Sequence, residues 1–225
     1  DIKVHVVLRS GASSLAIKAY SAIDIPTICT DGKVSGNIIE ILTPKVALSG
    51  IIPETFMLAD TVPESFNLDI KGYKSDTPER VFIPRRGNRR LINNDEVTTF
   101  LESKGFTTLY FEDLSPSEEW SITRNAKAVV AVYGAACSHI KFNRVGLNSA
   151  NKLGSGVRMV ELFSPAFTTS GNRYVSGVLN GRWCAVRGQF TPEIIRALDF
   201  CPEGRQFTTL ESPIKDPFKI DISSL

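Results

Sequence analysis

The alternation of short apolar runs with capped helical segments between residues 80 and 163 constrains the fold most strongly. Residues 128–132 (AVVAV) form a continuously apolar run, which is typical of a strand buried on both faces of a parallel sheet. Residues 157–163 repeat this type, and residues 80–83 and 106–111 predict two further strands. Because helical segments separate these runs, the spacing predicts β-α-β crossovers. We therefore expect an α/β protein with Rossmann-like layered domains and mostly parallel sheets.

Two helix starts in this stretch carry capping signals. Asn93 is followed by Glu96, and Ser115 by Glu118, so each pair predicts a capping box in which both side chains satisfy backbone amides. Gly105 stands where the first of these helices would end in the left-handed region. We expect the second helix to run to about residue 125.

The remaining segments have weaker patterns. The predicted strands lie at residues 3–8, 27–30, 38–41, 46–48, 183–186 and 218–222, and the predicted helices at 13–23 and from 191 onward. Residues 52–78 are rich in proline and glycine and predict a linker. We therefore expect residues 1–75 to form a small N-terminal α/β lobe and residues 76–225 a Rossmann-like lobe.

Composition excludes several function classes. With 42% hydrophobic residues, the 225-residue chain suits a folded globular protein with a sizeable core. The formal net charge of +2 is too small for whole-surface attraction to nucleic acid or anionic lipid, so any basic function has to be local. No apolar run approaches the roughly 18 residues of a transmembrane helix, so we expect no membrane span.

The four cysteines stand far apart without a C-x-x-C pair, at residues 29, 137, 184 and 201. This spacing disfavours structural zinc, and the chain is longer than most disulfide scaffolds. We interpret the cysteines as reduced, mostly buried thiols in a reducing compartment. The sequence begins at Asp1 without a methionine, so we also expect it to be a domain of a longer polypeptide.

Residues 85–90 (RRGNRR) carry four guanidinium groups between a strand and a helix start. Parallel sheets bind ligands outside the carboxyl ends of their strands, and guanidinium forks pair bidentately with phosphate. The free amides of the following helix start favour the same anion. Arg85, Arg89 and Arg90 therefore predict a phosphate site. A solvated basic loop or a nucleic-acid patch is the alternative.

Other candidate site residues follow the buried strands. Tyr133, Gly134 and Ala135 come directly after residues 128–132, where small residues let a ligand or a neighbouring backbone approach closely. Glu161 lies near the carboxyl end of the next apolar strand and is a candidate for holding ribose or sugar hydroxyls, with a salt bridge to Arg158 or to the arginine loop as the alternative. His139, one of two histidines, is a candidate base, although a lone histidine is more often structural.

Several catalytic motifs are absent from the sequence. It contains no G-x-S-x-G, no Walker A, no G-x-G-x-x-G and no H-E-x-x-H pattern. These absences remove most hydrolase, kinase and dehydrogenase interpretations.

The order of the remaining motifs resembles the C-terminal, donor-binding half of glycosyltransferase family 61. The motifs are residues 82–97 (FIPRRGNRRLINNDEV), 105–106 (GF), 114–119 (LSPSEE), 125–136 and 160–162 (VEL). The resemblance implies a GT-B glycosyltransferase with two Rossmann-like lobes, the N-terminal one reduced here. It would transfer a sugar from a nucleotide-sugar such as a UDP-sugar to a glycan hydroxyl, in polysaccharide biosynthesis in a bacterial or viral-host cytoplasm.

The resemblance also implies roles for individual residues. Arg85 and Arg90 match arginines at the donor diphosphate, Asn93 matches a helix-start asparagine, and Glu161 matches an acidic residue near the nucleotide. Such enzymes are usually metal-independent, so no metal or other cofactor is expected. The catalytic base commonly comes from the first lobe, which makes Asp31 a weak candidate beside His139.

Three positions depart from the family pattern. Tyr133 stands in place of a histidine, His139 in place of an asparagine, and Glu119 in place of a glutamine. Because tyrosine carries no positive charge, a non-catalytic nucleotide- or phosphoglycan-binding module is a second hypothesis. A nucleic-acid-binding domain using the arginine loop is a third.

Overall fold

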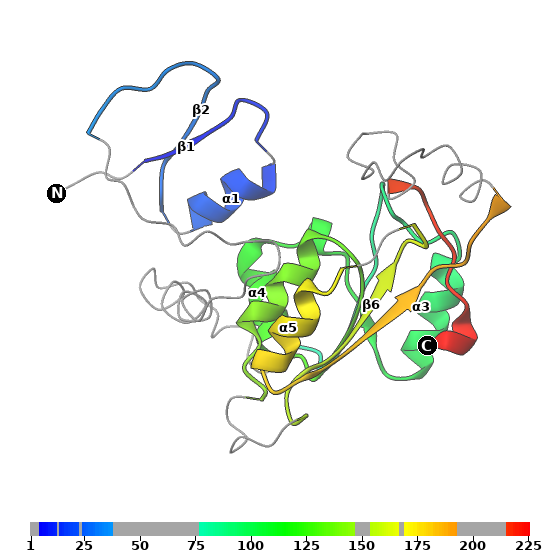
Figure 1. Ribbon diagram of the computed structural model, residues 1–225. Coiled ribbons are helices and arrows are strands. Elements are labelled where there is room, and N and C mark those ends of the chain that lie inside the picture. Colours follow the sequence, from blue (N-terminus) through cyan, green and yellow to red (C-terminus); the bar gives the residue numbers. More distant parts are fainter. Residues whose placement is uncertain are drawn as a thin grey trace.

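A five-stranded parallel sheet forms the centre of the protein (Figure 1). The computed structural model describes residues 5–12, 14–22, 24–37, 77–146, 154–166, 169–192 and 215–225. The strands are β3 (Arg80–Ile83), β4 (Thr107–Thr108), β5 (Ala128–Val132), β6 (Arg158–Phe163) and β7 (Arg182–Arg187). They are ordered β4-β3-β5-β6-β7, and each neighbouring pair is parallel. The predicted Rossmann-like α/β architecture is therefore confirmed.

Helices cover both faces of this sheet (Figure 1). Helix α3 (Asn94–Ser103) lies on one face, and α4 (Pro116–Asn125), the 3-10 helix η2 (Ala135–Phe142) and α5 (Gly171–Val178) lie on the other. Along β3, Val81 and Ile83 pack toward α4 and η2, whereas Phe82 packs toward α3. Both faces of the strand are buried from residue 81 onward, which is why Val81, Phe82 and Ile83 are all apolar.

A second, two-stranded parallel sheet belongs to the N-terminal region. Strands β1 (Val6–Leu8) and β2 (Thr27–Cys29) pair with each other in parallel, and helix α1 (Ser14–Ala22) lies between them in the sequence. Helix α1 contacts α4. The predicted strands at 38–41 and 46–48 and the boundary near residue 75 lie outside the described residues. The division into 1–75 and 76–225 therefore stays a prediction.

The two predicted capping boxes had different outcomes. Ser115 and Glu118 form the expected box at the start of α4, with the Glu118 amide donating to Ser115 Oγ at 3.3 Å and the Ser115 amide donating to Glu118 Oε2 at 2.7 Å. The box at Asn93 was wrong, although Asn93 is the N-cap residue, because its side chain makes no capping bond. Instead, Asn93 Nδ2 donates to Glu96 Oε2 at 2.9 Å, and the side chain also binds the C-terminal segment. Gly105 has a φ of 79°, as its position after α3 predicted.

Two predicted strands near these elements were also wrong in extent. Of residues 106–111, only Thr107–Thr108 pair, and the chain then turns into the 3-10 helix η1 (Phe111–Asp113). Of residues 218–222, Phe218 alone pairs, in a single bridge to Leu91, and η5 (Ile222–Ser224) follows. Phe106, Phe218 and Ile220 pack on the α3 side of the sheet, and Leu109 and Phe111 on the α4 side, so burial alone produced the strand-like pattern. Beyond residue 192, the predicted helix lies outside the described residues.

The cysteine prediction was partly wrong. Cys137 is buried, but Cys29 and Cys184 are exposed free thiols, and Cys201 lies outside the described residues. Cys29 belongs to a sheet of only two strands and Cys184 to the edge strand β7, so neither position has neighbours on all sides.

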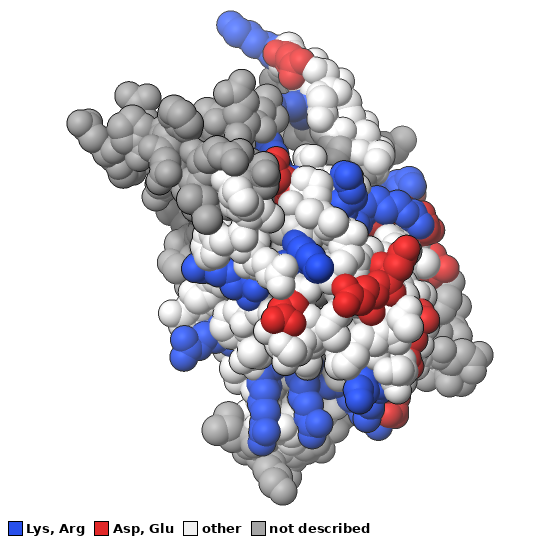
Figure 2. All heavy atoms as spheres, turned by 90° about the vertical axis from the view of Figure 1, so that its right-hand side faces the viewer, with Lys and Arg blue, Asp and Glu red and all other residues white. Residues whose placement is uncertain are grey.

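The surface has the mixed charge that the small net charge suggests. On the face shown in Figure 2, basic and acidic side chains are interspersed. Among the described residues, none of the helices combines the length and the hydropathy that a membrane span requires.

Candidate active site

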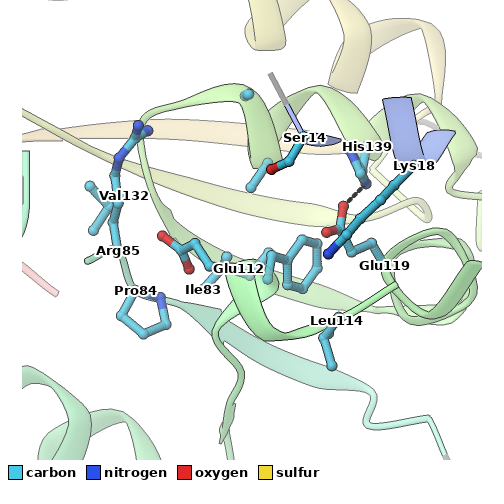
Figure 3. A pocket seen from close by; sticks show the side chains of 13 residues that line it. Ser14, Lys18, Ile83, Pro84, Arg85, Glu112, Leu114, Glu119, Val132 and His139 are labelled. Atoms are coloured by element: carbon cyan, nitrogen blue, oxygen red, sulfur yellow. Dashed lines mark ion pairs between the residues drawn. The ribbon is translucent and has the colours of Figure 1, made fainter. Parts of the chain in front are cut away.

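A cavity of about 270 Å³ opens at the carboxyl edge of β3 and β5, where a Rossmann-like sheet binds its ligands (Figure 3). Its wall combines the ends of these strands with residues of η1, α4, η2 and α1. The lining residues are Ser14, Lys18, Ile83, Pro84, Arg85, Phe111, Glu112, Leu114, Glu119, Val132, Ala135, Ala136 and His139.

Two guanidinium groups lie near one another at this edge without carboxylate partners. Arg85 lines the cavity (Figure 3), and Arg89 lies close enough for the charge of Arg85 to help lower its pKa, after burial as the larger cause. The Arg89 Nε is buried without a hydrogen-bond partner. Among the described residues neither arginine forms an ion pair. The pair therefore presents uncompensated positive charge.

The other two arginines of the loop have different environments. Arg86 forms a bidentate ion pair with Asp113, at 2.5 and 2.8 Å, and its guanidinium lies 4.0 Å from the centre of the Tyr110 ring. Its positive charge is therefore already balanced on the side facing η1. The Arg90 side chain is exposed, and its carbonyl accepts a hydrogen bond from the Phe218 amide at 3.1 Å.

The turn after β5 is shaped around Arg85 and Arg89. A Cβ atom on Gly134 would overlap the Arg85 guanidinium, so the absence of a side chain there makes room for it. The Tyr133 ring stacks on Phe163, with centroids 4.8 Å apart, and the Arg89 guanidinium lies 5.5 Å from the Tyr133 centroid. Ala135 lines the cavity directly. The structure thus brings the predicted residues Arg85, Tyr133 and Gly134 together with Arg89.

The family model for glycosyltransferase 61 matches residues 22–149, more than half of the chain. The chain belongs to glycosyltransferase family 61. No curated protein matches the sequence. Membership confirms the resemblance and implies glycosyl transfer between a sugar donor and an acceptor.

The matched range differs from the range of the motifs. It begins inside α1, sixty residues before the first motif at residue 82, and it ends before β6. In this family 61 chain the VEL motif with Glu161 therefore lies outside the match.

The C-terminal segment holds the arginine loop in place, a contact that sequence reasoning missed. The Arg89 amide donates to the Lys215 carbonyl at 2.8 Å. The Asn93 side chain donates to the Ile220 carbonyl at 2.9 Å and accepts from the Ile220 amide at 3.1 Å. Both groups of the Asn93 amide are thus engaged by backbone, which gives this residue a structural role in the glycosyltransferase. The predicted donor contact of Asn93 remains untested.

Glu161 is fully buried beneath this edge of the sheet. Its carboxylate accepts from Asn172 Nδ2 at 2.7 Å and from Trp183 Nε1 at 2.6 Å, and burial raises its pKa. These neutral donors, and not Arg158, are its partners. Glu161 is not among the cavity-lining residues, so its predicted nucleotide contact stays a prediction.

The two candidate bases lie in different places. His139 lines the cavity beside Glu119, with Nδ1 3.1 Å from Glu119 Oε2 (Figure 3). Asp31 is exposed after β2, where hydrogen bonds from Ser10 lower its pKa, and it does not line the cavity. Of the two, the structure brings His139 to Arg85.

Several cavity residues had no sequence signal. Ser14 and Lys18 reach the wall from α1, and Phe111 and Glu112 reach it from η1. Helix α1 precedes the arginine loop by more than sixty residues, so only the packing of α1 on α4 brings them together. Glu119 could be singled out from the sequence because it stands where the family pattern has a glutamine. That departure did not indicate that His139 is its partner.

Proposed function

We propose that this family 61 enzyme binds a nucleotide-sugar with its diphosphate at Arg85 and Arg89 and transfers the sugar to a hydroxyl of a glycan acceptor. The observation that carries the proposal is the pair of adjacent guanidiniums, of Arg85 and Arg89, at the carboxyl edge of a parallel sheet, with which no carboxylate in the described part of the chain forms an ion pair. Uncompensated guanidinium charge in a partly buried site is the environment that a phosphate group complements.

The same groups would stabilise the leaving diphosphate. When the bond between the anomeric carbon and the phosphate oxygen breaks, negative charge collects on the diphosphate. Preorganised cations lower the free energy of that transition state. We propose that Arg85, Arg89 and the exposed Arg90 supply this charge without a divalent metal or other cofactor. Tyr133 would add a platform and a hydroxyl donor in place of the family's histidine.

The cavity volume limits what it can hold. About 270 Å³ is just below the ~300–1,000 Å³ of small-molecule sites, so it fits part of a nucleotide-sugar. We propose that the sugar and diphosphate occupy the cavity and that the nucleoside lies toward Gly134, Ala135 and the end of β6, the side of Glu161. UDP is the nucleotide we would test first.

We further propose a GT-B arrangement. The β1-α1-β2 unit would belong to a small acceptor-side lobe that contributes Ser14 and Lys18 to the cavity. Other domains of a longer polypeptide would complete that lobe. The exposed free thiols Cys29 and Cys184 favour a reducing compartment, so we place the enzyme in the cytoplasm, in polysaccharide or glycan synthesis.

A thermal-shift screen against UDP-, GDP-, dTDP- and CMP-sugars, with and without Mg²⁺, tests the proposal. We expect one nucleotide class to raise the melting temperature without Mg²⁺, because ligand binding to the folded state stabilises it. Arg85→Ala should abolish the shift, and Arg86→Ala should keep it because Asp113 already balances Arg86. A shift that both variants retain would contradict the proposed site. Binding without nucleotide release over many acceptors would favour the non-catalytic module.

A further inference from the structure

Glu119 and His139 form a contacting pair in the wall of the cavity. Glu119 comes from α4 and His139 from η2, and the side chains are only 4% and 15% exposed. The Nδ1 and Oε2 atoms lie 3.1 Å apart, which is an ion-pair distance, although Nδ1 lacks a hydrogen bond of good geometry. Catalytic hydrogen bonds often become well aligned only when substrate is bound. The arrangement is that of an imidazole backed by a carboxylate.

The fold orients the imidazole toward the cavity. The Ser115–Glu118 capping box fixes the first turn of α4, which carries Glu119. The rings of Phe111 and Phe142 lie 6.0 and 6.2 Å from the His139 ring. With Nδ1 facing Glu119, Nε2 is left without a hydrogen-bond partner among the described residues, in a side chain that lines the cavity with Arg85.

The charged side chains around the pair come from four helical elements, η1, α4, η2 and α1, and from the loop after β3. Burial raises the pKa of Glu119 to about 7, with the nearby carboxylates of Glu112 and Glu118 adding to the shift. Burial lowers the pKa of His139 to about 4, with Lys141 adding to that shift. From the other sides of the cavity, Lys18 on α1 and Arg85 after β3 contribute positive charge. Near neutral pH the imidazole is therefore uncharged, and the Glu119 carboxylate 3.1 Å away stabilises the imidazolium that forms when the ring accepts a proton.

Glu119 and His139 are also two of the three positions at which the chain departs from the family pattern that it resembles. That pattern has a glutamine where Glu119 stands and an asparagine where His139 stands. Amides do not accept a proton at neutral pH, whereas an imidazole backed by a carboxylate does. The contacting pair thus supplies a proton acceptor in this cavity where the family pattern implies two amide side chains.

We propose that His139 is the general base of sugar transfer and that Glu119 is its positioning residue. This inference rests on the proposed function. The acceptor hydroxyl would give its proton to Nε2, and its oxygen would form the new bond to the anomeric carbon. The bond from that carbon to the phosphate oxygen breaks, and its electron pair leaves with the diphosphate beside Arg85. The Glu119 carboxylate stabilises the imidazolium until the proton passes to solvent.

The test compares the wild type with His139→Asn, Glu119→Gln and the double variant, which carry the residues of the family pattern at these positions. His5→Asn is the control for the loss of a histidine. Donor binding is read by thermal shift with the four nucleotide-sugar classes. Turnover is read as nucleotide release with water as acceptor, between about pH 5 and pH 9. Circular dichroism checks that each variant is folded.

We expect His139→Asn to bind the donor normally and to release nucleotide roughly 100-fold more slowly, the lower end of the usual contribution of a general base. In the wild type, release should rise with pH through about 7 as Glu119 ionises. Glu119→Gln should remove that rise, which a purely structural role would not do. His5→Asn should match the wild type.

The outcomes separate the two proposals. If the wild type binds no nucleotide-sugar, the proposed function fails. If it binds one but releases no nucleotide, or if His139→Asn keeps the wild-type rate and pH profile, the base assignment is overturned. NMR of the two histidine rings gives a second check in the unmodified chain. A neutral His139 carrying its proton on Nδ1 at pH 7 is expected, and a proton on Nε2 would contradict the assignment.

Discussion

The two edges of the central sheet both carry arginines, but they use them differently. At the amino edge, Arg80 donates to the Lys104 carbonyl at the end of α3 at 2.7 Å, and Lys127 pairs with Glu79. At the carboxyl edge, Arg85 and Arg89 have no carboxylate partner among the described residues. The comparison teaches that a basic residue indicates a ligand only where neither a carboxylate nor a backbone carbonyl of the described residues engages its charged group.

Acidic groups show a related difference. Glu79 and Asp113 are exposed and paired with cations, whereas Glu119 is buried at the carboxyl edge against a neutral imidazole. Burial of a charge without full compensation costs free energy of folding. The carboxyl edge therefore holds poorly compensated charge of both signs, which is typical of functional sites.

The largest expected effect is the loss of the two unbalanced guanidiniums. Replacing Arg85 and Arg89 together by alanine should weaken nucleotide-sugar binding by on the order of 100-fold or more, since each charge-assisted hydrogen bond contributes about 1.5–3 kcal/mol. Isothermal titration calorimetry measures this. The matched variant Arg86→Ala should change the affinity less than about threefold. Equal losses in both variants would break the comparison.

The next largest effect concerns Glu119 and pH. Its pKa in the folded protein, about 7, lies above its ordinary value of 4.5, so the folded state favours the protonated form. The stability contributed by this protonation is complete below about pH 4.5 and is lost as the pH rises through 7. When the pH is raised from 5 to 8, the free energy of unfolding of the wild type should fall by on the order of 2 kcal/mol more than that of Glu119→Gln.

Urea unfolding of both proteins at the two pH values measures the difference. Glu102→Gln, an exposed carboxyl on α3, serves as the control and should show the wild-type pH dependence. If the free energy of unfolding had the same pH dependence in the wild type and in Glu119→Gln, the charge of buried Glu119 would be better stabilised by its surroundings than the geometry indicates.

A smaller effect is expected from filling the space beside Arg85. In Gly134→Ala the new methyl group would displace the Arg85 guanidinium, which is the mobile end of a long side chain. We expect donor affinity to fall by roughly tenfold, about 1.4 kcal/mol, with a smaller change in folding stability. Gly177→Ala on α5, where a Cβ meets no neighbouring atom, should leave donor binding unchanged. Titration calorimetry with thermal unfolding tests both.

The smallest effect belongs to the amino edge. Arg80→Ala removes the hydrogen bond to the Lys104 carbonyl and should lower the free energy of unfolding by about 0.5–1 kcal/mol, without changing donor affinity. Urea unfolding and titration calorimetry report the two quantities. A loss of donor affinity as large as that of Arg85→Ala would remove the distinction between the edges.

Short-range signals in the sequence predicted much of the fold. The apolar runs at β5 and β6 predicted buried parallel strands because side chains on both faces must be apolar there. Ser115 and Glu118 predicted the start of α4 because the capping bonds connect residues three apart. The same reasoning gave a false box at Asn93, where the competing partner, Ile220, lies far along the chain.

The site was predicted in part for the same reason. The arginine cluster, the small residues after β5 and the family resemblance located the carboxyl edge, and Arg85, Ala135 and His139 do line its cavity. The sequence could not separate Arg85 and Arg89 from Arg86, because the separation depends on Asp113, which belongs to η1. It could not show that Glu161 is enclosed by Asn172 and Trp183.

By itself, then, the sequence determined the parallel α/β class, the start of α4 and the edge of the sheet at which the cavity opens, because these depend on periodicity and on contacts between near neighbours. Only the tertiary structure decided which charges remain unbalanced, that α1 contributes Lys18 to the cavity, and that Glu119 meets His139. Those outcomes depend on burial and on partners distant in the sequence, and burial is a property of the packed molecule as a whole.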